Sequence, residues 1–323
     1  MAAYEIDEIR KVPLGGMRQK IHIRGSKREN PVLLFLHGGP GVTNRHSVIL
    51  GHSELASRFT LAAWDQRGTG GSYFGAKRAT MTVKTFVQDV YELVLYLNRT
   101  LGKKRVFLIG GSWGTELGIR FVAAHPELVE AYVGYGQTVN GFLNEQLTYD
   151  FVLQKAREAG DRKALKMLEK IGPPQEGCYR PMYGGLLKHR ALLAKYGGSS
   201  VKRAGLWQGT VHPILFSGEY SFTDKLGILL GHRFTLSAMW RDVVRYDFIR
   251  EAARLEVPVY FFQGRYDYNT PSSLVTRYFQ ELEAPHKELV WFEHSSHNPL
   301  GEEKELFHRL LIKKLLSGRT QAV

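Results

Sequence analysis

The sequence has a single cysteine, Cys178, among its 323 residues. One cysteine excludes an intramolecular disulfide and leaves no cysteine-based metal cluster. The chain also has no stretch close to the roughly 18 uninterrupted apolar residues that a membrane-spanning helix needs. Its first residues carry charges where a signal peptide requires an apolar run. These absences predict a protein that neither crosses a membrane nor enters the secretory route, and we expect it to be cytoplasmic.

Acidic residues are few relative to basic ones. The chain has 44 Lys and Arg against 31 Asp and Glu, a formal net charge of +13. Such a balance is compatible with nucleic-acid or anionic-surface binding. However, the basic residues are scattered, with small clusters only at 103–105 and 313–314, and the aromatic residues lie in apolar stretches. We therefore interpret the charge as a solvated surface and predict no nucleic-acid partner.

Strands and helices are predicted to alternate over the first 136 residues. A hairpin is expected over 4–12 and 17–24, followed by strands that are apolar throughout. Strands with no polar face are typical of a parallel sheet covered by helices on both sides. The further strands are expected at 31–36, 60–64, 106–109 and 130–135, and the helices at 45–57, 82–101 with Thr82 as N-cap, and 113–124.

The pattern changes after about residue 137, because strand-like apolar runs stop until about residue 250. We predict a core in two parts, 1–136 and 251–323, separated by a helical cap at 137–250 that lies over the sheet edge. Helices are expected at 145–159, 162–171, 185–196 and 222–240 in the cap, and at 271–282 and 300–316 in the second core part, whose strands are 257–262 and 288–292.

A glycine-flanked serine stands between an expected strand and an expected helix. Residues 110–114 read GGSWG, which is a G-x-S-x-G motif in the setting of a nucleophile elbow. The turn is so tight that the residues two before and two after Ser112 must lack side chains. It would raise the hydroxyl above the sheet. The simpler interpretation is a glycine-rich turn whose serine caps the helix.

A serine nucleophile needs a base, and the base needs a third group that fixes its tautomer. In this topology an acid and then a histidine should follow the serine, each just beyond a later strand. Asp267 follows the strand at 257–262, and His297 follows the strand at 288–292. The spacing therefore predicts a Ser112–Asp267–His297 triad.

Other residues compete for these roles. His294 is the rival base because it lies closer to its strand end, although His297 lies in the loop that must reach back over the sheet. Asp65 also follows a strand, but it precedes the serine and is next to Arg67, which favours an ion pair that holds the loop. Asp247 ends the helical insert and is suited to orienting a helix. Both histidines could also be ordinary surface or capping residues.

A tetrahedral oxyanion would need backbone donors that already point at it. One donor should be the N–H of Trp113, the residue after the serine. The second should come from the loop after the strand at 31–36, where residues 37–41 read HGGPG. Glycines let a backbone approach a substrate closely, and Gly39 N–H is the candidate donor. The alternative is a simple tight turn.

Taken together, these motifs resemble an α/β-hydrolase of the proline iminopeptidase type. The resemblance implies Ser112, Asp267 and His297 as the triad, a helical cap before the strand that carries the acid, and no cofactor. The matching segments, in the order of the family, are HGGPG at 37–41, DQRGTGGS at 65–72, GGSWGT at 110–115, GRYD at 264–267 with Pro271, and the late His297.

The match is weaker in the cap. The resemblance implies that cap carboxylates bind the free α-amino group of the substrate and that aromatic residues hold the proline ring, but the Trp-x-x-Trp-Glu element of one branch of the family is absent. Glu219, with Tyr220 and Trp207 nearby in sequence, is the expected amine anchor. The carboxylates available in the insert are Glu145, Glu219, Asp224, Asp242 and Asp247.

The leading hypothesis is a serine aminopeptidase that releases N-terminal proline or a similar residue from a short peptide or amide, so that its partner is a small-molecule or short-peptide substrate. A second hypothesis keeps the triad but makes the protein an esterase, lactonase or small-amide hydrolase with a different cap pocket. Aspartate at the elbow would indicate an epoxide hydrolase or dehalogenase, and Ser112 disfavours both. A third hypothesis, a non-catalytic binding protein on the same fold, would require a broken triad, and none is visible.

Overall fold

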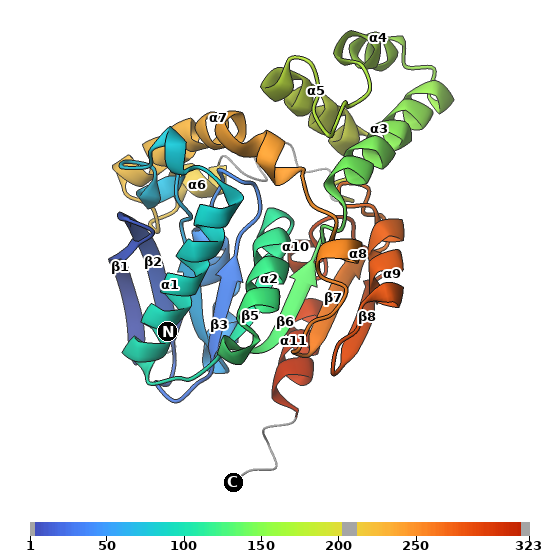
Figure 1. The fold of residues 1–323 in the computed structure, drawn as a ribbon. Coiled ribbons are helices and arrows are strands. Elements are labelled where there is room, and N and C mark those ends of the chain that lie inside the picture. The colour runs from blue at the N-terminus through green and yellow to red at the C-terminus, as the bar shows by residue number, and fades with distance from the viewer. Residues whose placement is uncertain (1–3, 202–211, 318–323) are drawn as a thin grey trace.

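A computed structural model of the chain describes residues 4–201 and 212–317. Its centre is one eight-stranded sheet in the order β1-β2-β4-β3-β5-β6-β7-β8 (Figure 1). β1 and β2 form an antiparallel hairpin, β2 pairs antiparallel with β4, and all other neighbours are parallel. The expected parallel sheet with an N-terminal hairpin is confirmed. The strands are β1 (Ile6–Leu14), β2 (Met17–Gly25), β3 (Val32–Leu36), β4 (Thr60–Trp64), β5 (Val106–Gly111), β6 (Val129–Tyr135), β7 (Val259–Gly264) and β8 (Lys287–Phe292).

The central strands are buried on both faces, which explains their uninterrupted apolar sequence. In β3 every residue is buried, and alternate side chains enter two different cores. Leu34 and Leu36 pack with the helices on one face, whereas Leu33 and Phe35 pack on the other. Because side chains alternate along a strand, an all-apolar strand can line two cores at once.

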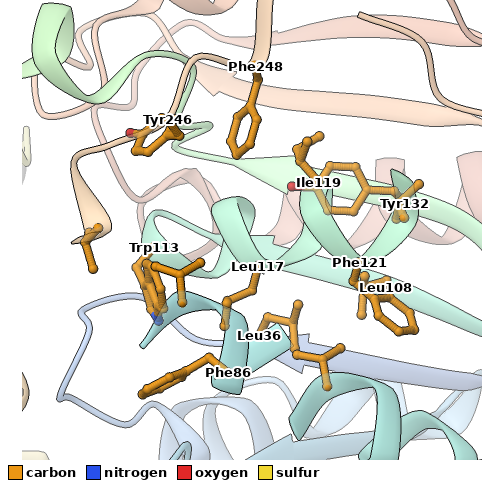
Figure 2. Packing of buried hydrophobic residues seen from close by; sticks show 14 of the residues in the cluster. Leu36, Phe86, Leu108, Trp113, Leu117, Ile119, Phe121, Tyr132, Tyr246 and Phe248 are labelled. Carbon is orange, nitrogen blue, oxygen red and sulfur yellow. The ribbon is translucent and has the colours of Figure 1, made fainter. Parts of the chain in front are cut away.

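Helices cover both faces of the sheet. α1 (Val83–Leu101), α2 (Trp113–Ala124) and α9 (Ser272–Glu281) lie on one face, and α11 (Lys304–Leu316) lies on the other, preceded by the short α10 (Pro299–Glu302) (Figure 1). Thr82 caps α1 as expected, because its hydroxyl accepts a hydrogen bond from Thr85 N at 3.2 Å. Figure 2 shows how this face packs: the Trp113 ring meets Phe86 of α1 edge-on, with 5.7 Å between the ring centroids.

The stretch between β6 and β7 contains six helices and no strand among its described residues: α3 (Gly141–Glu158), α4 (Arg162–Ile171), α5 (Met182–Lys195), α6 (His212–Phe216), α7 (Phe222–Val243) and α8 (Phe248–Glu251). In Figure 1, α3, α4 and α5 stand out above the β6–β8 part of the sheet, and α7 crosses above the β1–β4 part. α7 begins with a capping box between Ser221 and Asp224. The division of the chain into core and cap at 137 and 250 stays a prediction.

Two expected helices are broken. Residues 45–57 form two separate turns, Ser47–Gly51 and Ser53–Ser57, because His52 leaves the helical region and its Nδ1 lies 2.8 Å from His308 Nε2. The helix expected at 300–316 is interrupted at Glu303, whose carboxylate accepts hydrogen bonds from the loop after β8. In both places a tertiary contact outweighs helix continuity. Within the parts of the chain that the structure describes, no helix is long and apolar enough to cross a membrane.

Candidate active site

Ser112 lies on the sharp turn between β5 and α2. Its backbone has φ 52°, a left-handed conformation that non-glycine residues rarely adopt. The two flanking glycines are required by contact: a Cβ on Gly114 would come within 1.9 Å of Leu36 O, and one on Gly110 within 2.6 Å of Gly114 O. Strained serines of this kind are typical of functional sites, where the surrounding structure holds them in place.

Hydrogen bonds hold the strained turn against β6. Ser112 N–H donates to Tyr135 O at 3.0 Å. The Ser112 carbonyl accepts from Thr115 N at 2.7 Å and from the Thr115 hydroxyl at 2.6 Å. The Thr115 hydroxyl also lies 3.0 Å from that of Thr138, which follows β6. Ser112 thus lies at the carboxyl ends of β5 and β6.

Asp267 lies just beyond β7 and is buried. Its Oδ1 accepts hydrogen bonds from Asn269 N at 2.8 Å and Thr270 N at 2.9 Å. Its Oδ2 accepts from the Thr270 hydroxyl at 2.7 Å and from Gln263 Nε2 at 3.0 Å, and lies 3.0 Å from His297 Nδ1. Donors on every side therefore fix the carboxylate, and its remaining contact orients the imidazole.

His297 lies against the end of β6. A Cβ on Gly136 would come within 2.7 Å of His297 Cε1, so the glycine after β6 is what leaves room for the ring. Gly136 directly follows Tyr135, whose carbonyl holds the Ser112 N–H. The rival base His294 is exposed instead, and its backbone N–H donates to Glu303. Of the two histidines, only His297 contacts the acid.

The loop after β3 passes over Ser112. A Cβ on Gly38 would come within 3.2 Å of Ser112 Cβ, and Gly39 has φ 124°, which favours glycine. The loop is locked by His37, whose Nδ1 lies 2.8 Å from Gly38 O and whose Nε2 accepts from Gln66 N at 3.1 Å. Because Nε2 accepts a hydrogen bond from a backbone N–H, the proton of the neutral ring is on Nδ1. Burial lowers the pKa of His37 to about 4.

A cavity of about 200 Å³ lies between the elbow and the helical insert. Its core side is formed by Ser112, Gly39 and Trp113. Helices α3, α5 and α7 form the opposite side. The insert side mixes apolar and charged residues, namely Asn144, Glu145, Leu186, Leu187, Arg190, His232, Leu236, Trp240 and Val243.

Comparison with known proteins identifies the family. Residues 31–171 match the sequence model of the α/β hydrolase fold. The chain is 30% identical over 311 residues to the probable aminopeptidase YbaC of Bacillus subtilis, and the match covers 94% of each chain. The chain belongs to the α/β-hydrolase family. A proline iminopeptidase of Clostridium botulinum is 25% identical over 88% of this hydrolase and 89% of the relative.

Solved structures have the same fold. VinJ superposes on the hydrolase with a TM-score of 0.67 at 21% identity, covering 98% of this chain and 99% of VinJ. The proline iminopeptidase of Mycobacterium smegmatis superposes with a TM-score of 0.65 at 18% identity, covering 98% of this chain and 100% of that one. At such low identity these two likenesses concern the fold alone. The resemblance noted from the motifs is confirmed at the level of the family, and the hydrolase is an enzyme.

Two carboxyl groups line the cavity. Glu145 of α3 is buried, and its Oε1 accepts from Arg190 of α5 at 2.5 Å. Its Oε2 is buried without any hydrogen-bond partner in the described residues. Glu116 of α2 is also buried, and from the described residues it accepts only a long hydrogen bond, 3.4 Å, from Arg120 Nε. Burial raises the pKa of Glu116 well above its usual range.

Sequence reasoning did not single out either group. Glu145 was one of five acidic candidates, and Glu116 was not considered. The sequence contains a pattern that indicates Glu116: a side chain four residues after the serine lies one helical turn away and leans back toward the helix N-terminus. An acidic residue beside Leu117 and Ile119 is also unusual on a buried helix face.

The structure places the expected amine anchor elsewhere. Glu219 and Tyr220 do not line the cavity next to Ser112. Glu219 instead accepts from Arg45 Nη1 at 2.6 Å and lies 2.7 Å from His22 Nδ1, while the Arg45 guanidinium lies over the Tyr220 ring. The aromatic residues close to Glu219 in the sequence do not indicate whether this segment faces the cavity. Trp207 lies outside the described residues.

Arg45 is the centre of a buried ion-pair group that we call the Arg45 cluster, consisting of Lys20, His22, Arg45, Asp65, Glu219 and Asp224. Arg45 contacts Asp65 at 3.2 Å and Asp224 at 2.9 Å. An ion pair at Asp65 was expected, but the expected partner Arg67 pairs with Asp89 instead, at 2.7 Å. Asp247 pairs with Arg250 at 3.5 Å, beside the start of α8.

Proposed function

We propose that the chain is a serine hydrolase that releases an N-terminal residue, preferably proline, from short peptides or amides, with Ser112, His297 and Asp267 as its triad. Two observations carry the chemistry: the 3.0 Å contact between Asp267 Oδ2 and His297 Nδ1, and the strained backbone of Ser112. Because Asp267 occupies Nδ1, the nitrogen left for the serine hydroxyl is Nε2. Relatives named aminopeptidase and proline iminopeptidase support the substrate class.

In this mechanism, His297 Nε2 takes the proton of the Ser112 hydroxyl as its oxygen attacks the substrate carbonyl carbon. The N–H groups of Gly39 and Trp113 stabilise the oxyanion that forms. The imidazolium, held by Asp267, then gives its proton to the leaving amine as the carbon–nitrogen bond breaks. Water, deprotonated by the same imidazole, attacks the acyl-enzyme and releases the free amino acid and the serine.

Glu145 is the better candidate for the amine anchor that was expected at Glu219. A buried carboxylate oxygen without a partner is costly unless a ligand supplies the missing donor. The unpaired Oε2 of Glu145 belongs to a residue that lines the cavity at Ser112, and a substrate ammonium is the donor that would complete it. Arg190 donates a hydrogen bond to the other oxygen of this carboxylate.

The experiment compares prolyl arylamide, N-acetylprolyl arylamide and an aryl acetate on the wild type, Ser112→Ala and Glu145→Gln. Ser112→Ala should lose nearly all turnover and leave a residual ~10³–10⁴ over water, and it should not react with a fluorophosphonate. Glu145→Gln should lose activity on prolyl arylamide alone. Glu158→Gln, on the exposed face of the same helix, is the matched control.

Two results would decide against the proposal. Unchanged turnover in Ser112→Ala, or no labelling of the wild type by the fluorophosphonate, would remove the triad and favour a binding protein. Equal rates on the free and acetylated prolyl substrates would retain the triad but favour an esterase, lactonase or amide hydrolase, whose cavity has no use for an ammonium group.

A further inference from the structure

A buried acid next to the proposed nucleophile has no evident structural role. Glu116 lies on α2 one helical turn after Ser112, it is 1% exposed, and it lines the same cavity as Ser112. Its side chain leans toward the N-terminal end of the helix, which is the end that carries the serine. Glu116 therefore lies at the edge of the space in which a substrate of Ser112 would lie.

A purely structural ion pair explains this position poorly. Glu116 and Arg120 are spaced as a helical i, i+4 pair, but their contact is 3.4 Å, and Arg120 also pairs with Glu251 at 3.2 Å. Removing a carboxylate from water is expensive unless short, well-formed hydrogen bonds replace the water. In the described part of the chain the Glu116 carboxyl makes no other hydrogen bond, which leaves it able to bind a ligand in the cavity.

The chemistry of an aminoacyl substrate fits that partner. The α-nitrogen is two bonds from the carbonyl carbon that Ser112 would attack, so an anchor for the nitrogen has to lie close to the elbow. Glu116 meets this condition through the geometry of α2 alone. An N-terminal proline carries two N–H bonds in its ammonium form, and the cavity offers two carboxyl groups, one on α2 and one on α3.

We propose that Glu116 is a substrate-binding residue that holds the α-ammonium group together with Glu145, and that it sets the preference for substrates with a free N-terminal amine. This inference rests on the proposed function. It makes the elbow helix itself, and not the insert alone, a determinant of specificity. The two carboxyl groups would grip the ammonium from the core side and from the insert side.

Binding is then coupled to a proton. Burial holds Glu116 neutral in the free enzyme over a range in which an exposed glutamate is ionised. The charged groups around it are Arg120 on its own helix, Asp242 on α7 and Glu251 on α8, with Tyr246 nearby and the Glu145–Arg190 pair across the cavity. A bound ammonium favours the ionised form, so the carboxyl proton leaves to solvent as the substrate binds.

The test uses Glu116→Gln, which keeps size and shape but cannot ionise. Glu251→Gln is the matched control, because it removes the other partner of Arg120 and lies outside the cavity. Each variant is assayed with prolyl arylamide and with 4-nitrophenyl cyclopentanecarboxylate, which has the same ring with carbon in place of the nitrogen. Glu116→Gln should lose ~10–100-fold in kcat/KM on the prolyl substrate, the range of a charge-assisted hydrogen bond, and change the ester rate less than about twofold.

Several outcomes overturn the proposal and can be told apart. If Glu116→Gln retains the prolyl rate while Glu145→Gln loses it, Glu116 is no anchor and the proposed function stands. If Glu116→Gln loses the ester and prolyl rates equally, its role is structural. If the wild type hydrolyses prolyl arylamide and its N-acetyl derivative at equal rates, the proposed function fails and this inference fails with it.

A second measurement needs no Glu116 variant and covers the case in which Glu116→Gln does not fold. Calorimetric binding of L-prolinamide to Ser112→Ala, in buffers of different ionisation enthalpy near pH 6.5, counts the protons that binding releases. Repeated from pH 5 to pH 7, the binding of prolinamide should release protons, fewer as the pH rises, and cyclopentanecarboxamide should release none. No release with prolinamide anywhere in this range would overturn the inference.

Discussion

Mild acid should weaken the fold through His37. The ring is 0% exposed, and its two nitrogens serve as one donor and one acceptor, since Nδ1–H donates to Gly38 O and Nε2 accepts from Gln66 N. A proton on Nε2 would place the Nε2–H group opposite the backbone N–H of Gln66, so that two donors would face each other without an acceptor. Burial accordingly lowers the pKa of His37 from 6.5 to about 4.

The sign and size of the effect follow from linkage. Between pH 6.5 and pH 4 the unfolded chain carries a proton on His37 and the folded chain does not, so the free energy of unfolding falls as the pH falls. A difference of one pKa unit between the folded and unfolded chains changes the free energy of unfolding by about 1.4 kcal/mol. For His37 the total loss of stability, reached below pH 4, is therefore about 3 kcal/mol. About 2 kcal/mol of this should disappear between pH 7 and pH 5.

The assay is urea unfolding from pH 5 to pH 7.5 for the wild type, His37→Gln and His294→Gln. Gln cannot titrate, and its amide oxygen can still accept from Gln66 N. The difference in free energy of unfolding between wild type and His37→Gln should shrink by about 2 kcal/mol from pH 7 to pH 5. His294, which is exposed, is the control for replacing a histidine by glutamine. Parallel pH profiles for wild type and His37→Gln would refute the reasoning.

Three further outcomes are expected. Arg45→Met should lower the free energy of unfolding by about 3–5 kcal/mol in urea titrations, because three buried carboxylates lose their shared guanidinium; a loss under 1 kcal/mol would show that these contacts do not hold the fold. Gly114→Ala should cost more than about 2 kcal/mol by the same measurement, since its Cβ would lie 1.9 Å from Leu36 O, whereas Gly218→Ala, with open space around it, should be nearly neutral. Asp267→Asn should reduce kcat on prolyl arylamide by about 10⁴-fold with little change in KM, and a KM effect alone would assign Asp267 to substrate binding.

Much of the core could be predicted because backbone geometry dictates it. The alternation of apolar strands and helices fixes a parallel sheet, and a parallel sheet places the residues after its strands at one edge. Asp267 and His297 were selected on this rule and lie in contact. The glycines at 110 and 114 were expected from sterics, and the reason is that a Cβ on them would clash with Gly114 O and Leu36 O, respectively.

The insert could not be predicted to the same depth. Its helices were expected from periodicity, but periodicity does not say which helix face meets the core. Glu219 has aromatic neighbours in sequence, yet its side chain contacts Arg45 and His22, which come from distant parts of the chain. The contact between Asp65 and Arg45 likewise depends on how two loops fold back on each other, and adjacency to Arg67 was misleading.

The Arg45 cluster limits how freely the helical insert of this enzyme could be exchanged for the insert of a relative. Two carboxylates at the start of α7 are neutralised by Lys20 and Arg45, which belong to the sheet hairpin and to the loop after β3. A transplanted insert without matching acids would leave Lys20 without its acidic partner and buried Arg45 with Asp65 alone. Grafting substrate preference onto this scaffold would therefore require exchanging the acids and their basic partners as one unit, or leaving α7 in place and replacing only α3 to α5.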